Sequence, residues 1–198
     1  MSPAQARTSA DAIVAAARGL LEEGGLDAVT MQAVANRVGV RAPSLYKRVA
    51  GRPALIGAIA EDVVAELDGT LLAARTASDP AEAVRIASAS YRSFARRSPA
   101  AYQLLFSRLL PQARPSAEAN AAGAAGVLLI ARRLAGDEHA LETARLFTAF
   151  IHGFVSMELA GAFRLGGDVD AAFSFGIETI LRGCRIHPPP GPGPALRL

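Results

Sequence analysis

The segment TMQAVANRVGVRAPSLYKRVAGR, residues 30–52, decides the fold of this chain because its pattern is typical of two helices joined by a tight turn. Thr30 is a residue type that caps helix N-termini, and Gly39 supplies the left-handed backbone conformation that ends a helix. Pro43 suits the first turn of the second helix, where its missing N–H leaves nothing unpaired. Leu45 can then fill the space between the helices. The segment therefore predicts a helix-turn-helix.

The same segment carries a concentration of positive charge. Between residues 37 and 52 the chain has five basic residues and no acidic residue, whereas both flanks are acidic. Cations and hydroxyls on an exposed short helix are the groups that contact phosphates and base edges. The pattern indicates a nucleic-acid-binding surface, and a solvated charged face is the alternative. The residues expected to point outward are Arg41, Ser44, Lys47 and Arg48, with Tyr46 at the edge of the helix.

The sequence on both sides of this segment also predicts helices. Alanine is frequent, glycine and proline separate the apolar stripes, and no stretch alternates apolar and polar residues for long. Upstream, the spacing of Thr8 and Asp11 resembles a capping box, and Gly24 and Gly25 should end the helix that it begins. Gly123 and Gly126 should allow close approach of helices. Downstream we expect helices at about residues 53–75, 81–97, 99–110, 116–134, 137–163 and 168–185.

Composition excludes several classes of protein. The chain has 198 residues, 51% hydrophobic and 20% charged, so it is long and apolar enough to bury a core. A lone cysteine, Cys184, excludes an internal disulfide and a thiolate zinc site. The N-terminus lacks the pattern of a signal peptide, and Glu158 makes the apolar stretch 146–163 a buried helix rather than a membrane span. We expect a cytoplasmic protein with a disordered, proline-rich tail over residues 187–198.

Residues 9–67 resemble the DNA-binding domain of the TetR family of bacterial repressors. The resemblance rests on SLYKRVAGRPAL, residues 44–55, in which Leu-Tyr, basic residues and a small-residue turn precede an aliphatic helix, and on EGGLDAVT, residues 23–30. Val49 stands where an aromatic residue is usual, and Pro53 stands where an acidic residue is usual. Arg48 occupies a position where histidine is common.

The resemblance implies a role for each matching residue. It implies that DNA phosphates are held by Thr30, Tyr46, Arg48 and Arg52, and that the major groove is faced by Arg41, Ala42, Pro43 and Lys47. It also implies a homodimeric transcriptional repressor that binds a palindromic operator in duplex DNA and is released by a small-molecule inducer.

The fold implied is all-α. A three-helix helix-turn-helix domain should cover residues 9–52, and a helical-bundle domain for ligand binding and dimerisation should cover residues 53–186, with helix 53–75 as the connector. The second domain resembles a subgroup named for a Trp-His-Gly motif, through His152-Gly153 and the segment AYQLLF, residues 101–106. The chain has no tryptophan, so the first residue of that motif is missing.

A surplus of large apolar side chains in the second domain predicts a pocket for a small, largely apolar ligand. His152 and Ser156 are four residues apart, so they share one face of an otherwise apolar helix, and a few polar groups in an apolar cavity usually orient a ligand. The alternative is that His152 is satisfied by a carbonyl or a neighbouring side chain. The expected ligand-binding residues are Tyr91, Phe94, Tyr102, Phe106, Phe150, His152 and Ser156.

The helix expected at 137–163 is apolar nearly all round, so it should be covered on two sides. One cover is its own domain, and the other is a second copy of the chain. We expect the interface on the helices near 116–134 and 168–185. The residues expected there are Val127, Ile130, Phe173, Ile177 and Ile180.

The remaining residues offer no catalytic or metal-binding pattern. The three histidines lack the spacing of metal ligands, no glycine-rich phosphate loop is present, and no acid, base and nucleophile cluster together. We therefore expect no metal, no cofactor and no enzymatic activity. Two alternatives remain: an enzyme on a helical scaffold, and a helical ligand-binding or interaction protein without sequence-specific DNA binding.

Overall fold

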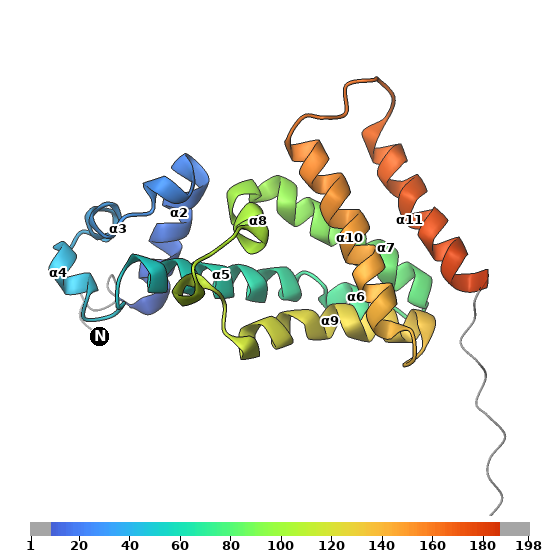
Figure 1. Ribbon diagram of the computed structural model, residues 1–198, viewed down its shortest axis with the longest axis horizontal. Coiled ribbons are helices and arrows are strands. Elements are labelled where there is room, and N and C mark those ends of the chain that lie inside the picture. Colours follow the sequence, from blue (N-terminus) through green and yellow to red (C-terminus); the bar gives the residue numbers. More distant parts are fainter. Residues whose placement is uncertain (1–8, 187–198) are drawn as a thin grey trace, which may run out of the picture. The chain divides into compact units, whose positions relative to one another are not determined.

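A computed structural model describes residues 9–186, which form helices joined by short loops and contain no strand (Figure 1). The expected all-α fold is confirmed. The expected proline-rich tail, 187–198, lies outside the described residues. The elements are α2 (Ala10–Ala28), α3 (Met31–Val38), α4 (Ala42–Leu45), α5 (Arg52–Gly69), α6 (Leu72–Thr76), α7 (Pro80–Arg97), α8 (Pro99–Phe106), the 3-10 turn η1 (Pro111–Ala113), α9 (Ala117–Ala135), α10 (Ala140–Leu159) and α11 (Val169–Ile186).

The N-cap of the first helix lies one residue after the position expected from the sequence. Ser9 caps α2, its hydroxyl accepting the N–H of Ala12 at 3.2 Å, whereas Thr8 lies outside the described residues. At the other end Gly24 and Gly25 leave the helical conformation, with Gly25 at φ 69°. The expected end of the helix at these glycines is therefore confirmed, and the short stretch after them is a separate turn of helix.

The helix-turn-helix forms as its sequence predicts. The hydroxyl of Thr30 accepts the N–H of Ala33 at 3.1 Å and caps α3, and Gly39 ends it at φ 73°. Helix α4 begins at Ala42, with Pro43 in its first turn. It continues as a turn in which the amides of Arg48 and Val49 donate to the carbonyl of Leu45.

The connector expected as one helix from 53 to 75 is two helices. Helix α5 ends at Gly69, and α6 begins at Leu72. Arg75 of α6 reaches back over this break and donates to the Asp68 carboxylate and carbonyl. Sequence periodicity did not predict the break because the apolar pattern continues through Leu71, which is buried.

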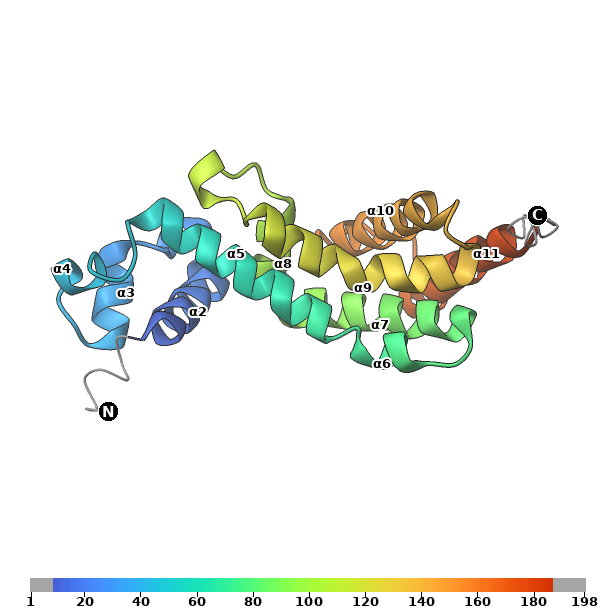
Figure 2. The same ribbon diagram turned by 90° about the horizontal axis from the view of Figure 1, so that it is seen from below.

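The described residues divide into two compact units. One contains the residues up to Leu67 together with Phe94–Gly123, and the other contains Asp68–Ser93 together with the residues from Ala124 onward. The division differs from the boundary expected at residue 52. In the first unit, Figure 2 shows α2, α3 and α4 grouped beside the start of α5.

Both glycines of α9 lie against a neighbouring side chain. A Cβ on Gly123 would lie 2.3 Å from Val64 of α5, and a Cβ on Gly126 would lie 2.3 Å from the Arg75 guanidinium. The expected close approach is confirmed at both positions. Among the described residues, no helix combines the length and the apolar character needed to span a membrane.

Candidate nucleic-acid interface and ligand cavity

Helix α4 and the turn after it expose a group of cations. Leu45 is fully buried and anchors the helix, while Tyr46 on the next position is 57% exposed. Arg41, Lys47 and Arg48 are exposed, and none of them has a partner within residues 9–186. Three positive charges without an internal counter-ion are available to an external anion.

The other groups expected to face DNA are also accessible, with one exception. Pro43 and Ser44 are exposed, and Ala42 is half-buried. Thr30 is exposed even though its oxygen caps α3, and a hydroxyl that accepts one hydrogen bond can still donate another. Thr30 can therefore cap the helix and contact a phosphate at the same time.

Arg52 is the exception, because its side chain turns inward. Its Nε donates to the carbonyl of Val29, and its Nη2 donates to the carbonyl of Leu26, both at 2.7 Å. Leu26 lies in the last turn of α2 and Val29 directly follows that helix, so Arg52 ties the start of α5 to the segment that leads into α3. Arg52 therefore acts as a clamp within the chain that uses two of its N–H donors, and its expected contact with a phosphate stays a prediction.

Arg37 also adds no free positive charge to this surface, because it is paired with a carboxylate. Its guanidinium makes a two-point contact with the Glu23 carboxylate, at 2.8 and 2.6 Å. This hydrogen-bonded pairing lowers the pKa of Glu23 and raises the pKa of Arg37. The surface offered to DNA is therefore narrower than the five basic residues of the sequence suggest.

Carboxylates position the helices around this surface. Glu22 accepts the amides of Ala100 and Ala101 at the start of α8, at 3.1 and 2.9 Å, a position where the helix dipole favours negative charge. Arg18 of α2 contacts both Asp62 and Glu66 of α5 at 2.7 Å. These contacts hold α2, and with it the helix-turn-helix, against α5 and α8.

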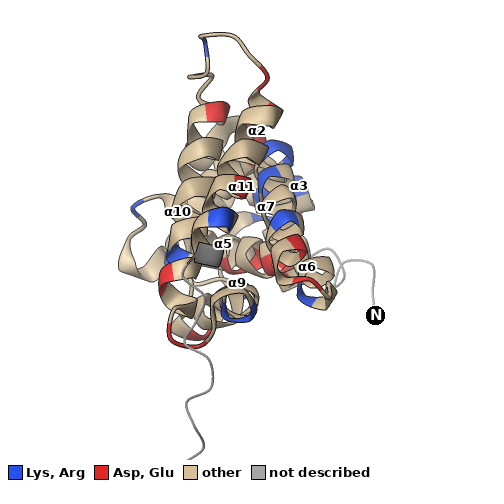
Figure 3. Ribbon diagram, turned by 90° about the vertical axis from the view of Figure 1, so that its right-hand side faces the viewer, with Lys and Arg blue, Asp and Glu red and all other residues tan. Residues whose placement is uncertain are grey.

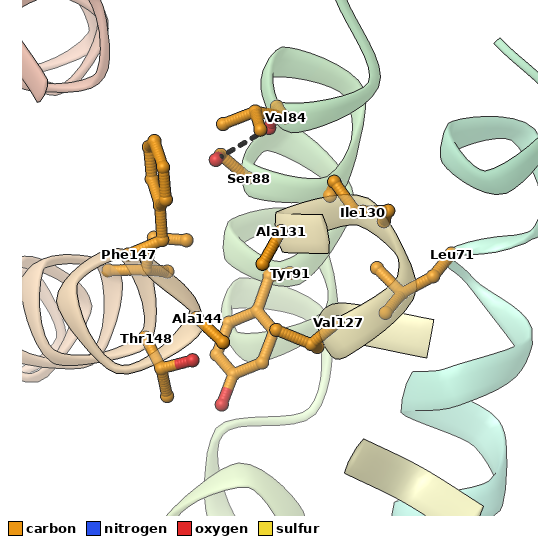
Figure 4. A pocket seen from close by; sticks show the side chains of 12 residues that line it. Leu71, Val84, Ser88, Tyr91, Val127, Ile130, Ala131, Ala144, Phe147 and Thr148 are labelled. Carbon is orange, nitrogen blue, oxygen red and sulfur yellow. Dashed lines mark hydrogen bonds between the residues drawn. The ribbon is translucent and has the colours of Figure 1, made fainter. Parts of the chain in front are cut away.

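The second unit encloses a small apolar cavity between α7, α9 and α10, with Leu71 at the start of α6 as a further wall (Figure 4). Its volume is about 40 Å³. No charged side chain lines the cavity, and the surface that faces it is almost entirely hydrocarbon although Ser88, Tyr91 and Thr148 are among the lining residues. The lining residues are Leu71, Val84, Ala87, Ser88, Tyr91, Val127, Ile130, Ala131, Ala144, Phe147, Thr148 and Ile151.

Only one of the expected ligand-binding residues, Tyr91, lines this cavity. Tyr102 and Phe94 are buried in the first unit, and Phe106, which contacts Tyr102, is 42% exposed there. Phe150 stacks on Phe173 of α11 with ring centroids 5.9 Å apart. The cavity faces a different side of α10, so Phe150 belongs to the packing between α10 and α11.

His152 and Ser156 also lie outside this cavity lining. They contact each other, with 3.4 Å between the Ser156 hydroxyl oxygen and His152 Nδ1. Burial lowers the pKa of His152. The pairing corresponds to the alternative in which a neighbouring side chain satisfies His152. A ligand contact by either residue stays a prediction.

Arg92 of α7 joins α10 and α11 through charge and ring contacts. Its guanidinium contacts Glu158 at 2.6 and 2.8 Å and Asp170 at 2.7 Å. It also lies 4.8 Å from the centroid of the Phe173 ring, a favourable arrangement for a cation over an aromatic face. Arg92 is 7% exposed and the Asp170 side chain is 70% exposed, so the pairing links three helices from the interior out to the surface.

Three of the five residues expected at a dimer interface are already buried within one chain. Ile130, Phe173 and Ile177 are 4%, 5% and 3% exposed within one chain, and Val127, like Ile130, lines the cavity. Ile180 is half-buried. Figure 3 shows α10 and α11 with long uncharged stretches. The large exposed apolar side chains on these helices are Leu141, Leu146, Met157 and Phe175.

Sequence reasoning missed most of the cavity wall because its residues are unremarkable in sequence. Ala87, Ala131 and Ala144 come from three helices, and each leaves space that a larger side chain would fill. In a chain so rich in alanine, no spacing distinguishes these three. Thr148 offered the one usable signal, since it lies one turn before His152 in the apolar part of α10. No group of three or more potential metal ligands occurs among residues 9–186.

Two family models match the chain. Residues 13–59 match the bacterial regulatory proteins of the tetR family, and residues 84–180 match the tetracyclin repressor-like C-terminal domain. The first match contains the helix-turn-helix, and the second contains most of the cavity wall. Together the two matches cover well over half of the sequence.

Similar proteins agree with these matches. An uncharacterised HTH-type transcriptional regulator of Mycobacterium tuberculosis, Rv0681, is 29% identical over 179 residues, covering 89% of this chain and 80% of that protein. A TetR transcriptional regulator of Streptomyces coelicolor has the same fold, with a TM-score of 0.69 at 20% identity over 90% of this chain and 98% of the other. A TetR variant from Acinetobacter baumannii, solved in complex with minocycline, has a TM-score of 0.66 at 23% identity over 89% and 96%.

Proposed function

Because this chain belongs to the TetR family of bacterial transcriptional regulators, we propose that it is a cytoplasmic repressor. It binds a palindromic operator as a homodimer and leaves it when a small, largely apolar ligand binds in the second unit. The family is one of regulators and not of enzymes. The observation that supports the proposal most directly is the unpaired positive charge of Arg41, Lys47 and Arg48 around α4.

The position of these groups supports a division of labour on DNA. Arg41 occupies the N-cap position of α4, and its side chain makes no capping hydrogen bond. Its guanidinium can therefore reach a base edge, as arginine commonly does with guanine. Lys47 is assigned to the groove in the same way. Arg48, Tyr46 and Thr30 are assigned to phosphates, which fix position without reading sequence.

Dimerisation is proposed on exposed apolar side chains of α10 and α11. Leu146 and Met157 are 50% and 49% exposed and lie eleven residues apart, which places them on one face of α10. Phe175 of α11 is 67% exposed. Large side chains exposed to this degree mark interaction sites when they gather on one surface. We keep Ile180 in the proposed interface and replace its buried neighbours by these residues.

Release by a ligand follows if the ligand favours a conformation in which the two α4 helices no longer match successive major grooves, about 34 Å apart. The solved TetR variant that binds minocycline is a precedent for a ligand in a protein of this fold. Membership of the Trp-His-Gly subgroup stays a prediction, since His152 and Gly153 are present and tryptophan is absent.

The proposal is tested with DNA from upstream of the gene for this chain. Fluorescence anisotropy should show saturable binding whose affinity falls steeply with salt, because each phosphate that the protein neutralises releases counter-ions. Arg48→Ala should weaken binding to operator and to unrelated duplex alike and reduce the salt slope by about one, since one phosphate is no longer neutralised. Binding equally well to every duplex would favour the alternative of a protein without sequence-specific recognition.

The homodimer is tested separately by sedimentation. The wild-type chain should sediment as a dimer at micromolar concentration, and Phe175→Glu should shift it to a monomer and abolish operator binding together. Ser174→Glu, at an exposed position of the same helix that points to another side than Phe175, is the matched control for an added charge. A wild-type monomer that still binds the full palindrome would contradict the dimer.

A further inference from the structure

Helix α3, which precedes the cations of α4, carries two exposed amide side chains, Gln32 and Asn36. Gln32 Nε2 donates to Asn36 Oδ1 at 2.8 Å. The two residues are four positions apart, so they are neighbours on one face of the helix. Their side chains are polar and uncharged, whereas α4 and the turn after it expose Arg41, Lys47 and Arg48. The helix-turn-helix therefore presents two kinds of recognition chemistry.

The amide pair lies on the part of α3 that is turned away from α2. Each residue of an α-helix advances by about 100°, so Gln32 and Asn36 lie on either side of the point opposite Val34, which is fully buried. Arg37 lies on another flank and contacts Glu23 of α2. Figure 1 and Figure 2 both show α3 between α2 and α4. The exposed amides are therefore on the side of α3 where α4 and its cations lie.

The bond between the two amides determines which groups of Gln32 remain available. A glutamine amide has two N–H donors on its nitrogen and one acceptor oxygen. One N–H of Gln32 is given to Asn36. The second N–H and the oxygen Oε1 have no partner within residues 9–186. Gln32 thus offers one donor and one acceptor in the plane of an amide whose orientation Asn36 holds.

A donor and an acceptor on one amide are the complement of adenine in the major groove. Adenine presents N7 as an acceptor and its N6 amino group as a donor, and a glutamine amide binds both at once. Arginine and lysine only donate, so they suit guanine, whose O6 and N7 both accept. The DNA backbone, which the first helix of such a motif crosses, is the competing contact. A phosphate would leave the Gln32 oxygen without a donor, so the chemistry favours the base.

We propose that Gln32 reads one adenine in each half-site of the operator and that Asn36 is a positioning residue that holds the Gln32 amide. The inference rests on the proposed function, because it assigns part of the sequence preference of the same surface. Oε1 accepts from the adenine N6 amino group, and the N–H that Asn36 does not use donates to N7. Arg41 and Lys47 set the register of the motif in the groove, so Gln32 adds to their preference and does not replace it.

The first experiment finds the base pair that Gln32 reads. A pool of duplexes with randomised sequence is selected on the wild-type chain and on Gln32→Ala. The wild type should select an A·T pair at one position of each half-site where Gln32→Ala shows no preference, and both should agree at the other positions. Gln103→Ala removes an exposed glutamine of α8 in the same unit. This control should select the same sequence as the wild type.

The second experiment identifies the contacted atom. 7-Deazaadenine pairs with thymine as adenine does but has a carbon in place of N7. With this base at the selected position, the wild type should bind roughly 3- to 10-fold more weakly in anisotropy titrations, as expected for one lost hydrogen bond. Gln32→Ala should bind the modified and unmodified duplexes equally, because it makes no contact with N7.

Two variants test the positioning role of Asn36. Asn36→Ala removes the oxygen that holds the Gln32 amide, so the ratio of affinities for adenine and 7-deazaadenine should fall toward one. Asn36→Asp keeps an acceptor at the same position and should restore that ratio, although its negative charge weakens binding to every duplex. The ratio cancels that general loss, and melting curves show whether each variant is folded.

The inference is overturned if Gln32→Ala selects the same sequence as the wild type or loses affinity equally with 7-deazaadenine. Uniformly weaker binding of Gln32→Ala to all duplexes, with the adenine preference kept, would indicate a phosphate contact instead. An unchanged ratio in Asn36→Ala would contradict the positioning role. A wild-type chain that selects no sequence from the pool would contradict the proposed function itself, so the two failures give different results.

Discussion

The helix-turn-helix segment, residues 30–52, and the wall of the second-unit cavity differ in what their charged residues do. Around α4, Arg41, Lys47 and Arg48 have no counter-ion in the described structure. Around the cavity, Arg85 and Arg92 are paired with carboxylates and point away from the hydrocarbon interior. The number of basic residues in a region therefore does not locate a binding surface. A binding surface is indicated by basic residues that no carboxylate of the described structure pairs with.

The largest effect expected from this difference is at Arg92. Arg92→Met should lower the free energy of unfolding by about 3–5 kcal/mol, because it removes the two-point contact to the Glu158 carboxylate, which is 14% exposed. Urea denaturation measures the decrease. Arg182→Met on α11 is the control, since Arg182 is exposed and contacts only the Thr179 hydroxyl. Equal stability of the two variants would show that Arg92 is not the internal link described here.

A smaller effect separates two arginines of the same segment. Arg52→Met removes two charge-assisted hydrogen bonds to part-buried backbone carbonyls and should cost about 2–3 kcal/mol of stability. Arg48→Met should change stability by less than about 0.5 kcal/mol, as is usual for an exposed residue without partners. Thermal melting should therefore rank the two clearly, while both weaken DNA binding. Two variants of equal stability would contradict the clamp formed by Arg52.

A further test converts a paired cation into an unpaired one. Glu23→Gln leaves Arg37 without its carboxylate partner, so it should strengthen binding to any duplex at low salt and steepen the dependence on salt. The gain should disappear at high salt, where exposed charges are screened. Anisotropy titrations over a salt series measure both. Unchanged affinity at every salt concentration would indicate that Arg37 lies outside the DNA-binding surface.

The smallest expected effect is the pH dependence contributed by His152. Burial lowers the pKa of His152 in the folded chain, so the unfolded chain binds the proton more readily near its ordinary pKa of about 6.5. Stability should therefore fall as the pH drops below about 6.5. His152→Gln should show a smaller fall than the wild type in melting experiments. A larger fall in the variant would contradict the lowered pKa of His152.

The two regions also differ in how far the sequence predicted them. The caps, the turn and the anchor of the helix-turn-helix are local features, so Thr30, Gly39 and Leu45 could be assigned from a continuous stretch of sequence and are found as expected. The inward turn of Arg52 was not predictable, because its partners lie more than twenty residues away.

The cavity depends on contacts between distant helices, and the sequence predicted it poorly. Prominent side chains such as Phe150 and His152 were chosen for their chemistry, yet most of the wall is built by alanine, valine, leucine and isoleucine side chains. Val127 and Ile130 were assigned to a dimer interface because helical periodicity shows only that a helix face is apolar. It does not show which part of the protein covers that face. The break between α5 and α6 was missed for a related reason, since apolar residues continue through it.

The central claim is that unpaired cations around α4 read an operator, and one measurement tests it most directly. The Arg41→Ala, Lys47→Ala double variant is compared with the wild type by anisotropy on the upstream palindrome and on a scrambled duplex of equal length. The wild type should prefer the palindrome, and the double variant should lose that preference while it keeps weak binding to both duplexes. A double variant that retains the wild-type affinity and preference would contradict the assignment of these cations to the operator.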